Sequence, residues 1–175
     1  MYLSANPHVN TKNMLFPATQ RFSKIVELWR TAWRDDLGTV HPSAVYSAAV
    51  AHLLRGAKRM VVHFIQPHAP YIGKTKLLRG NLHQTKAFIE RGETPPPDPI
   101  ADIDPSLLRK AYLDNLELVM RYAYTLARKA RRFGIARIVI TADHGEILDE
   151  APVAEDRHPR GLAWRCLREV PWLEL

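Results

Sequence analysis

The sequence predicts an α/β fold with a largely parallel sheet. Segments with helical apolar spacing alternate along the chain with short hydrophobic runs rich in β-branched residues, and this alternation is typical of helices packed on a parallel sheet. Two of the hydrophobic runs end in histidines and carboxylates. Ligands of parallel sheets bind at the carboxyl ends of the strands, so these two ends are the first candidates for a functional site.

The individual elements follow from apolar periodicity and from the positions of proline and glycine. Strands are expected over residues 2–5, 58–66, 135–142 and 168–175. Helices are expected over residues 21–33, 41–56 and 105–133. The second helix has Pro42 near its start and Gly56 after its end, as helix boundaries favour. Residues 91–105 are rich in proline and acidic residues, which predicts a surface loop.

Length and composition predict one soluble domain covering residues 1–175. The 46% hydrophobic content argues against disorder and suffices for a core. No uncharged apolar run approaches the ~20 residues that span a bilayer, and residues 1–10 lack the features of a signal peptide. The single cysteine, Cys166, excludes an internal disulfide framework. We therefore expect a cytoplasmic protein and no membrane.

The net charge of +7 raises the question of a nucleic-acid partner. The densest basic cluster comprises Arg128, Lys129, Arg131 and Arg132 and closes a long helical pattern, where cations complement the helix dipole. No aromatic residues interleave with this cluster, as a base-stacking surface requires. We interpret it as a solvated helix end, with non-specific affinity for polyanions as the alternative. Nucleic acid is the disfavoured partner.

The segment "IARIVITADHGEIL" (135–148) changes from a hydrophobic strand to polar residues within a few positions. Asp143, His144, Gly145 and Glu146 follow the run that is typical of a strand buried in a parallel sheet. A carboxylate and an imidazole on consecutive residues can both reach one cation if the chain turns sharply, and Gly145 permits such a turn. The alternative is an N-cap followed by a turn.

The segment "VVHFIQPHAPYIG" (61–73) places His63 within a strand and His68 just after it. His68 lies between Pro67 and Pro70, whose fixed backbone angles stiffen the loop and suit a histidine that holds an anion or a metal. An incidental histidine in a proline-rich turn is the alternative for His68. A buried, hydrogen-bonded core histidine is the alternative for His63.

Taken in order, "HFIQPHAPY", "YLDNLELV", "VITADHGE", "RHPRGL" and "LREVPWLEL" resemble the sulfatase-like branch of the alkaline phosphatase superfamily. The resemblance runs from about residue 58 to residue 175. It implies an alkaline-phosphatase-like three-layer sandwich with a mostly parallel sheet, N-terminally truncated. It also implies metal-dependent hydrolysis of sulfate or phosphate esters.

The resemblance assigns roles to individual residues. Asp143 and His144 would be metal ligands, and His158 a further ligand or a contact to substrate. His68 would help to bind the sulfate or phosphate group, with His63 as the weaker candidate beside it. Glu146 would orient His144 as a neighbour of the ligands. The O/N ligand set favours zinc or manganese, and relatives with Asp-Asn at this place make calcium possible.

The sequence offers no recognisable nucleophile, which the family's mechanism needs together with acidic ligands after its first strand. Asp35 and Asp36 follow a helical pattern, Ser4 lacks the family's nucleophile context, and Cys166 lies near the wrong end. The chain is therefore expected to be truncated, non-catalytic, or completed by another polypeptide, with little hydrolase activity alone. A non-catalytic descendant that binds an anion or a partner is the alternative function.

Overall fold

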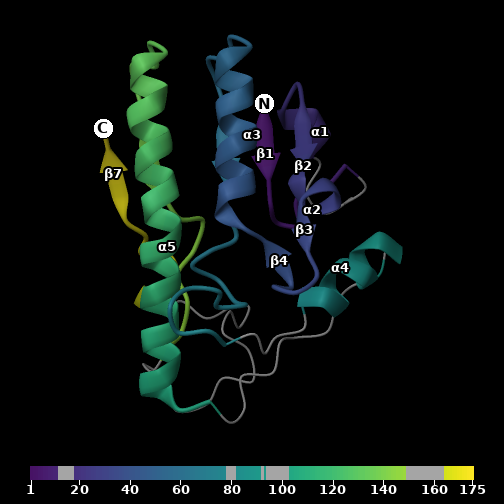
Figure 1. Cartoon of the computed structure of the whole chain (residues 1–175), viewed down its shortest axis with the longest axis vertical. Coiled ribbons are helices and arrows are strands. Elements are labelled where there is room, and N and C mark those ends of the chain that lie inside the picture. The colour runs from purple at the N-terminus through teal and green to yellow at the C-terminus, as the bar shows by residue number, and fades with distance from the viewer. Residues whose placement is uncertain (12–17, 78–81, 92, 94–102, 149–163) are drawn as a thin grey trace.

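The computed structural model describes residues 1–11, 18–77, 82–91, 93, 103–148 and 164–175, and these form a mixed α/β structure (Figure 1). The strands are β1 (Tyr2–Ser4), β2 (Ile25–Glu27), β3 (Trp33–Arg34), β4 (Thr39–Val40), β5 (Val61–His63), β6 (Val139–Thr141) and β7 (Trp172–Glu174). The helices are α1 (Ala18–Arg21), α2 (Leu28–Thr31), α3 (Pro42–Leu54), α4 (Leu82–Arg91), α5 (Pro105–Arg132) and α6 (Arg165–Arg168).

A three-stranded parallel sheet in the order β2-β1-β5 is the centre of the fold. Tyr2 of β1 pairs with Ile25 on one side and with Val61 on the other. Alternate side chains of a strand point to opposite faces, and Leu3, which is fully buried, lies on the face that packs against the helices. The expected α/β class and the parallel sheet are confirmed.

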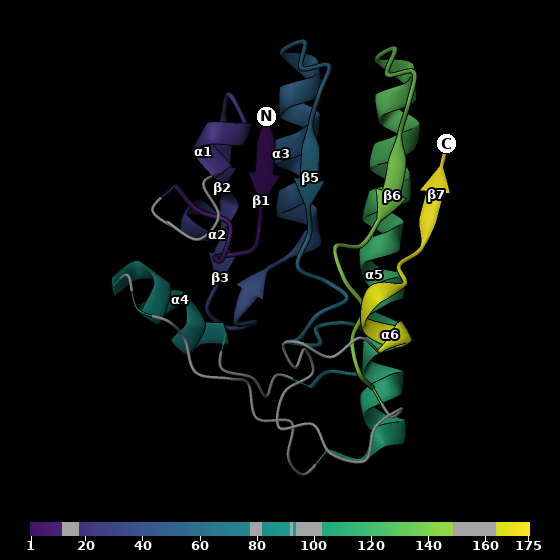
Figure 2. The same ribbon diagram turned by 180° about the vertical axis from the view of Figure 1, so that it is seen from behind.

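Helices α3 and α5 pack on one face of the strands, as the two opposite views show (Figures 1 and 2). The core between them contains Val45 and Ala49 of α3, Leu126 and Ala130 of α5, and Leu3. The 28 residues of α5 correspond to about 42 Å at the usual rise per residue. This helix therefore extends past the whole length of the strands and reaches the loops at both ends.

The boundaries of the long helices follow from their end residues. Asp104 caps α5 by accepting a hydrogen bond from the Leu107 N–H at 2.9 Å, and Pro105 occupies the first helical turn. At the other end Gly134 has φ +76°, a conformation that favours glycine and ends the helix. The helices predicted over 41–56 and 105–133 are thus confirmed with nearly the expected bounds.

The helix predicted over residues 21–33 is wrong. Residues 25–27 form β2 in parallel with β1, α2 is a single turn, and Trp33 begins β3. Ile25 and Val26 are β-branched, and pairing with β1 outweighs the helical spacing of the apolar residues around them. The tertiary partner therefore decides the conformation of this segment.

The last strands also differ from expectation. β6 pairs with β7 in antiparallel register, and Thr141 is exposed, so β6 is not the buried parallel strand that its hydrophobic run predicts. β7 lies within the strand predicted over 168–175. Most of the loop predicted over 91–105 lies outside the described residues. No helix in the described parts of the chain combines the length and apolar character needed to cross a membrane.

Candidate functional site

Three strands direct their carboxyl ends to the same edge of the structure, which we call the carboxyl edge. β1, β5 and β6 point the same way beside α3 and α5 (Figure 2). The chain leaves them through residues 5–8, 64–68 and 142–146, and every one of these segments carries a histidine. The arrangement is the one in which parallel sheets usually gather ligand-binding side chains.

Tyr2 and His63 form the best-defined contact between neighbouring strands on the open face of the sheet. The Tyr2 hydroxyl lies 2.9 Å from His63 Nδ1, and the two rings meet edge to face with centroids 5.8 Å apart. Burial, with the charge of Asp143 as a second cause, raises the pKa of Tyr2 to about 12. The phenol therefore keeps its proton at neutral pH.

The pKa of the His63 imidazole depends on residues that follow β6. Burial lowers the pKa of His63; the negative charge of Asp143 opposes this shift, and His144 adds to it. Asp143 thus acts on both Tyr2 and His63. Side chains from three separate chain segments are brought within electrostatic reach of one another.

Asp143 and His144 present donor atoms on the exposed side of this group. The Nδ1 of His144 lies 2.9 Å from the carbonyl oxygen of Gly145. A carbonyl oxygen only accepts, so Nδ1 carries the hydrogen and the neutral ring has its lone pair on Nε2. This is the tautomer that metal-binding histidines commonly adopt, with the other ring nitrogen held by a main-chain carbonyl.

The Asp143–His144 pair fits part of a metal site. Asp143 Oδ2 lies 3.8 Å from His144 Nε2, and two ligand atoms on one tetrahedral zinc ion lie about 3.3 Å apart. A small side-chain rotation would bring both onto one cation. Among the described residues, no group of three or more histidine, cysteine, aspartate and glutamate side chains is placed to hold a metal ion. His158, the expected further ligand, lies outside the described residues.

His68 is fixed in a similar way on the loop after β5. Its Nδ1 lies 2.8 Å from the carbonyl oxygen of Ala69, so this nitrogen is also the hydrogen donor. The neutral ring then offers a lone pair at Nε2, which binds a metal or accepts a proton. Only the protonated ring offers a second N–H to an oxyanion. The protonation state of His68 therefore decides which ligand it can bind.

The loop that carries His68 is held by a buried side chain of α5. Asn115 is fully buried, and its Nδ2 donates to the carbonyl oxygens of Pro67 at 3.0 Å and His68 at 3.1 Å. Its Oδ1 accepts from the Ile72 N–H at 3.1 Å. One amide thus closes both sides of the proline-containing turn, and it is a better restraint on the loop than the prolines alone.

His8 is a member of the site that sequence reasoning missed. It follows β1, and its N–H donates to Asn6 Oδ1 at 2.9 Å, which folds the chain back in a tight turn. Desolvation lowers the pKa of His8, and the charge of His68 lowers it further, so the two histidines are neighbours. The sequence did carry one signal for His8: it lies shortly after the strand predicted over residues 2–5, as the other site histidines lie near the ends of their strands.

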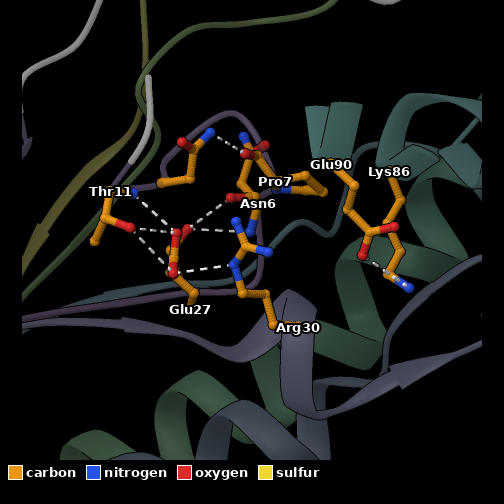
Figure 3. A network of polar contacts seen from close by, with 9 residues as sticks. Asn6, Pro7, Thr11, Glu27, Arg30, Lys86 and Glu90 are labelled. Carbon is orange, nitrogen blue, oxygen red and sulfur yellow. Dashed lines mark hydrogen bonds and ion pairs between the residues drawn. The ribbon is translucent and has the colours of Figure 1, made fainter. Parts of the chain in front are cut away.

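Glu27 places a carboxylate at the end of β2. Because the sequence predicts a helix over residues 21–33, Glu27 was not recognised as a residue at a strand end. Figure 3 shows it between the turn after β1 and Arg30. It accepts from the Thr11 N–H at 2.8 Å and from Arg30 Nε at 3.1 Å. These contacts hold the turn that carries His8, so Glu27 supports the site and is already balanced by a cation.

Of the residues considered as nucleophile or acidic ligand, Ser4 and Asp36 are engaged in other contacts, and the main chain of Cys166 packs against Gly145. Ser4 is fully buried, and its Oγ bonds to the backbone of Asn6 at 3.0 and 3.1 Å. Asp36 is bound by Arg34 Nε at 2.7 Å in the turn between β3 and β4, next to Asp35. Cys166 belongs to α6. Ser4 is held in a structural role, which argues against it as the nucleophile.

One further expectation beside His144 needs correction. Gly145 does not adopt a positive φ, and its role is close packing, because a Cβ there would overlap the Cys166 carbonyl oxygen. The Gly145 carbonyl oxygen is a partner of His144 Nδ1, and the role of Glu146 in orienting His144 stays a prediction. The charge of Glu146 acts on Tyr112 of α5, whose pKa is raised to about 12 by burial first and by Glu146 second.

Comparison of the chain with protein-family models, with curated proteins and with solved structures finds no match. The candidate function therefore depends on the residues at the carboxyl edge and on the resemblance of their motifs.

Proposed function

We propose that the chain is a sulfatase- or phosphatase-like domain that binds a divalent metal and a sulfate or phosphate ester at the carboxyl edge. The fold proposed with it is the alkaline-phosphatase-like sandwich. One observation carries the proposal: the charge of Asp143 acts on both Tyr2 and His63, so residues from three segments share one environment. An isolated aspartate in an N-cap would have no such partners.

The metal would be held by Asp143 and His144, with His158 as a further ligand. The carboxylate and the Nε2 lone pair of His144 are suitable donors for zinc or manganese. When bound, the metal would polarise an ester oxygen and stabilise negative charge on the transferred group. The Gly145 carbonyl keeps His144 in the required tautomer.

His63 would donate a hydrogen bond to the ester oxyanion. We assign the Tyr2 hydroxyl as the donor to His63 Nδ1, which places the proton of the neutral imidazole on Nε2. His63 then offers an N–H without carrying a charge. His68 would offer a second N–H in its protonated form, and Asn115 fixes the position of its backbone.

Hydrolysis is expected to be weak, because no nucleophile is recognised among the described residues. Covalent ester hydrolysis requires a nucleophile beside the metal, and losing it removes most of the rate. Turnover of aryl phosphate and aryl sulfate should be measured with zinc, manganese, magnesium and calcium. Little or no turnover is the expected result. Strong metal-dependent turnover abolished by Asp143→Ala would show that a nucleophile is present.

Oxyanion binding is the direct test of the proposed function. Phosphate and sulfate should be titrated against the wild type, His68→Gln and His63→Gln, with His52→Gln on the surface of α3 as the matched control. Both site variants should bind several-fold more weakly, and the control should not change. Equal affinity in all proteins, with the fold intact by circular dichroism, would contradict the proposal.

The alternative is a non-catalytic protein that binds anions or a partner through the same edge. The burial and hydrogen bonding of Ser4 favour it, since the one serine of the central strand is unsuited to attack an ester. Oxyanion binding that is independent of added metal, with no turnover, would support this alternative.

A further inference from the structure

A second charged surface lies at the opposite end of the strands from the carboxyl edge. We call it the basic edge and define it by Lys24, Arg55, Lys58, Arg59, Arg128, Lys129, Arg131 and Arg132. α3 and α5 both end there, and β1 and β5 both begin there (Figures 1 and 2). Only the cations of residues 128–132 are close together in the sequence; the others come from distant segments.

Hydrogen bonds between distant segments hold these cations in one place. Lys58 Nζ donates to the carbonyl oxygen of Phe133 at 3.1 Å, which joins the start of β5 to the end of α5. The amino group of Met1 donates to the Arg59 carbonyl at 3.2 Å. The Tyr2 N–H donates to the Lys24 carbonyl at 2.8 Å. The starts of three strands and the end of α5 are therefore tied together.

Among the described residues, the cations of the basic edge have no acidic partner, whereas most of the other described cations have one. None of the ion pairs among the described residues includes a member of the basic edge. Arginines elsewhere are paired, for example Arg34 with Asp36, Arg121 with Glu117 and Arg137 with Glu174. Eight cations that belong to no ion pair among the described residues therefore lie at this edge.

Helix-dipole compensation explains only part of this arrangement. Cations in the last turn of a helix offset its negative end, which accounts for Arg131 and Arg132. Lys24 and Arg59 precede strands and have no helix end of their own to compensate. Burial lowers the pKa of His52 on α3, and the charges of Lys24 and Arg55 lower it further, which reports a positive field there.

An apolar side chain stands among these cations. Leu54, the last residue of α3, is 67% exposed, and Val61 at the start of β5 is 42% exposed. Cations around an exposed leucine are typical of surfaces that bind anionic lipids, where the charges meet the headgroups and the apolar group enters the interface. A surface that binds single-stranded nucleic acid would instead carry aromatic side chains for stacking.

We propose that the basic edge docks the protein on an anionic lipid surface, with Leu54 entering the interface and the carboxyl edge facing away from it. This proposal departs from the expectation of no membrane partner, which was based on the lack of a bilayer-spanning segment and of a signal peptide. The proposal is independent of the proposed function, because no residue of the carboxyl edge takes part in it.

The test is sedimentation with vesicles of equimolar phosphatidylglycerol and phosphatidylcholine, compared with vesicles of phosphatidylcholine alone. The variant Arg59→Gln/Arg128→Gln/Arg132→Gln removes three exposed cations that donate no hydrogen bond among the described residues. Each cation near an anionic leaflet strengthens binding roughly fivefold before screening, so binding should weaken about tenfold or more. Lys74→Gln/Lys76→Gln/Arg168→Gln removes the same charge elsewhere and should bind like the wild type.

A second variant separates lipid docking from general attraction to polyanions. Leu54→Ser should weaken binding to the anionic vesicles several-fold and leave the affinity for single-stranded RNA unchanged. Absence of wild-type binding to the anionic vesicles would overturn the proposal. It would also be overturned if the two triple variants bound the vesicles equally, or if RNA were bound and vesicles were not.

Discussion

The side-chain amide of Asn115 donates to the main-chain carbonyl of His68 over 3.1 Å, so α5 directly fixes the backbone of the proposed oxyanion ligand. The same amide nitrogen donates to Pro67, and its oxygen accepts from Ile72. A buried amide with this many contacts serves two purposes. It satisfies the polar groups of the turn, and it transfers the rigidity of a long helix to the loop.

Asn115→Ala should therefore reduce both stability and oxyanion binding. Removing one partner leaves buried polar groups of the turn unsatisfied at about 1–3 kcal/mol each, so the free energy of unfolding should fall by about 3 kcal/mol. Urea denaturation measures this change. Leu113→Ala on the exposed side of the same helix is the control and should change stability by less than about 0.5 kcal/mol. A stable Asn115→Ala protein with normal phosphate affinity would contradict this role.

Tyr2→Phe should change the tautomer of His63. With the phenol assigned as the donor to Nδ1, the wild-type ring should be the Nε2–H form at neutral pH. Without the hydroxyl, both neutral forms should be populated. Long-range proton–nitrogen correlation spectra of nitrogen-15-labelled histidine distinguish the two. An Nδ1–H ring in the wild type would instead make His63 a candidate metal ligand.

The lowered pKa of His63 predicts a specific dependence of stability on pH. Burial disfavours the charged ring in the folded protein, so the unfolded chain binds the proton more readily as pH falls below about 6.5. The stabilisation is complete above that pH and is lost as pH decreases toward the folded pKa. Urea midpoints at about pH 7.5 and pH 5.5 should differ more in the wild type than in His63→Gln. An equal difference in both proteins would argue against a buried His63.

Asp143→Asn should lower the pKa of His63 further, because the aspartate charge favours the protonated ring. The pKa of Tyr2 should decrease as well, since the same charge disfavours the phenolate. Nuclear magnetic resonance titration of the histidine ring protons measures the first effect. Asp35→Asn, which removes an exposed carboxylate near the β3–β4 turn, is the matched control. If the pKa of His63 were unchanged in Asp143→Asn, the Asp143 carboxylate would not act on His63, and the ends of β5 and β6 would be electrostatically independent.

The sequence was sufficient for elements whose local signals agree with the tertiary structure. Pro42 and Gly134 mark helix ends, and the spacing of apolar residues along α5 matches its buried face. The polar residues at the ends of the strands predicted over 58–66 and 135–142 likewise made His68 and Asp143 candidates, with His63 inside the first of them. These signals depend on the chain within a few residues, and a single sequence carries that information.

The remaining features depend on partners that are distant in the chain. Ile25 and Val26 become a strand because β1 pairs with them, and Glu27 then appears at a strand end. His8 becomes a site residue only through its proximity to His68. The requirement for glycine at position 145 comes from the Cys166 carbonyl. The contacts of Ile25, Val26 and Gly145 leave no pattern in the neighbouring sequence, and His8 is marked only by its place after the first strand.

The central claim is that the Asp143–His144 pair at the carboxyl edge binds a divalent metal, and isothermal titration with zinc or manganese tests it most directly. The wild type, Asp143→Asn and Asp35→Asn should be compared at neutral pH after removal of bound metal. Loss of one carboxylate ligand should weaken binding by about tenfold or more in Asp143→Asn, while Asp35→Asn binds as the wild type does. Equal metal affinity in all of these proteins, or no binding by the folded wild type, would contradict the account.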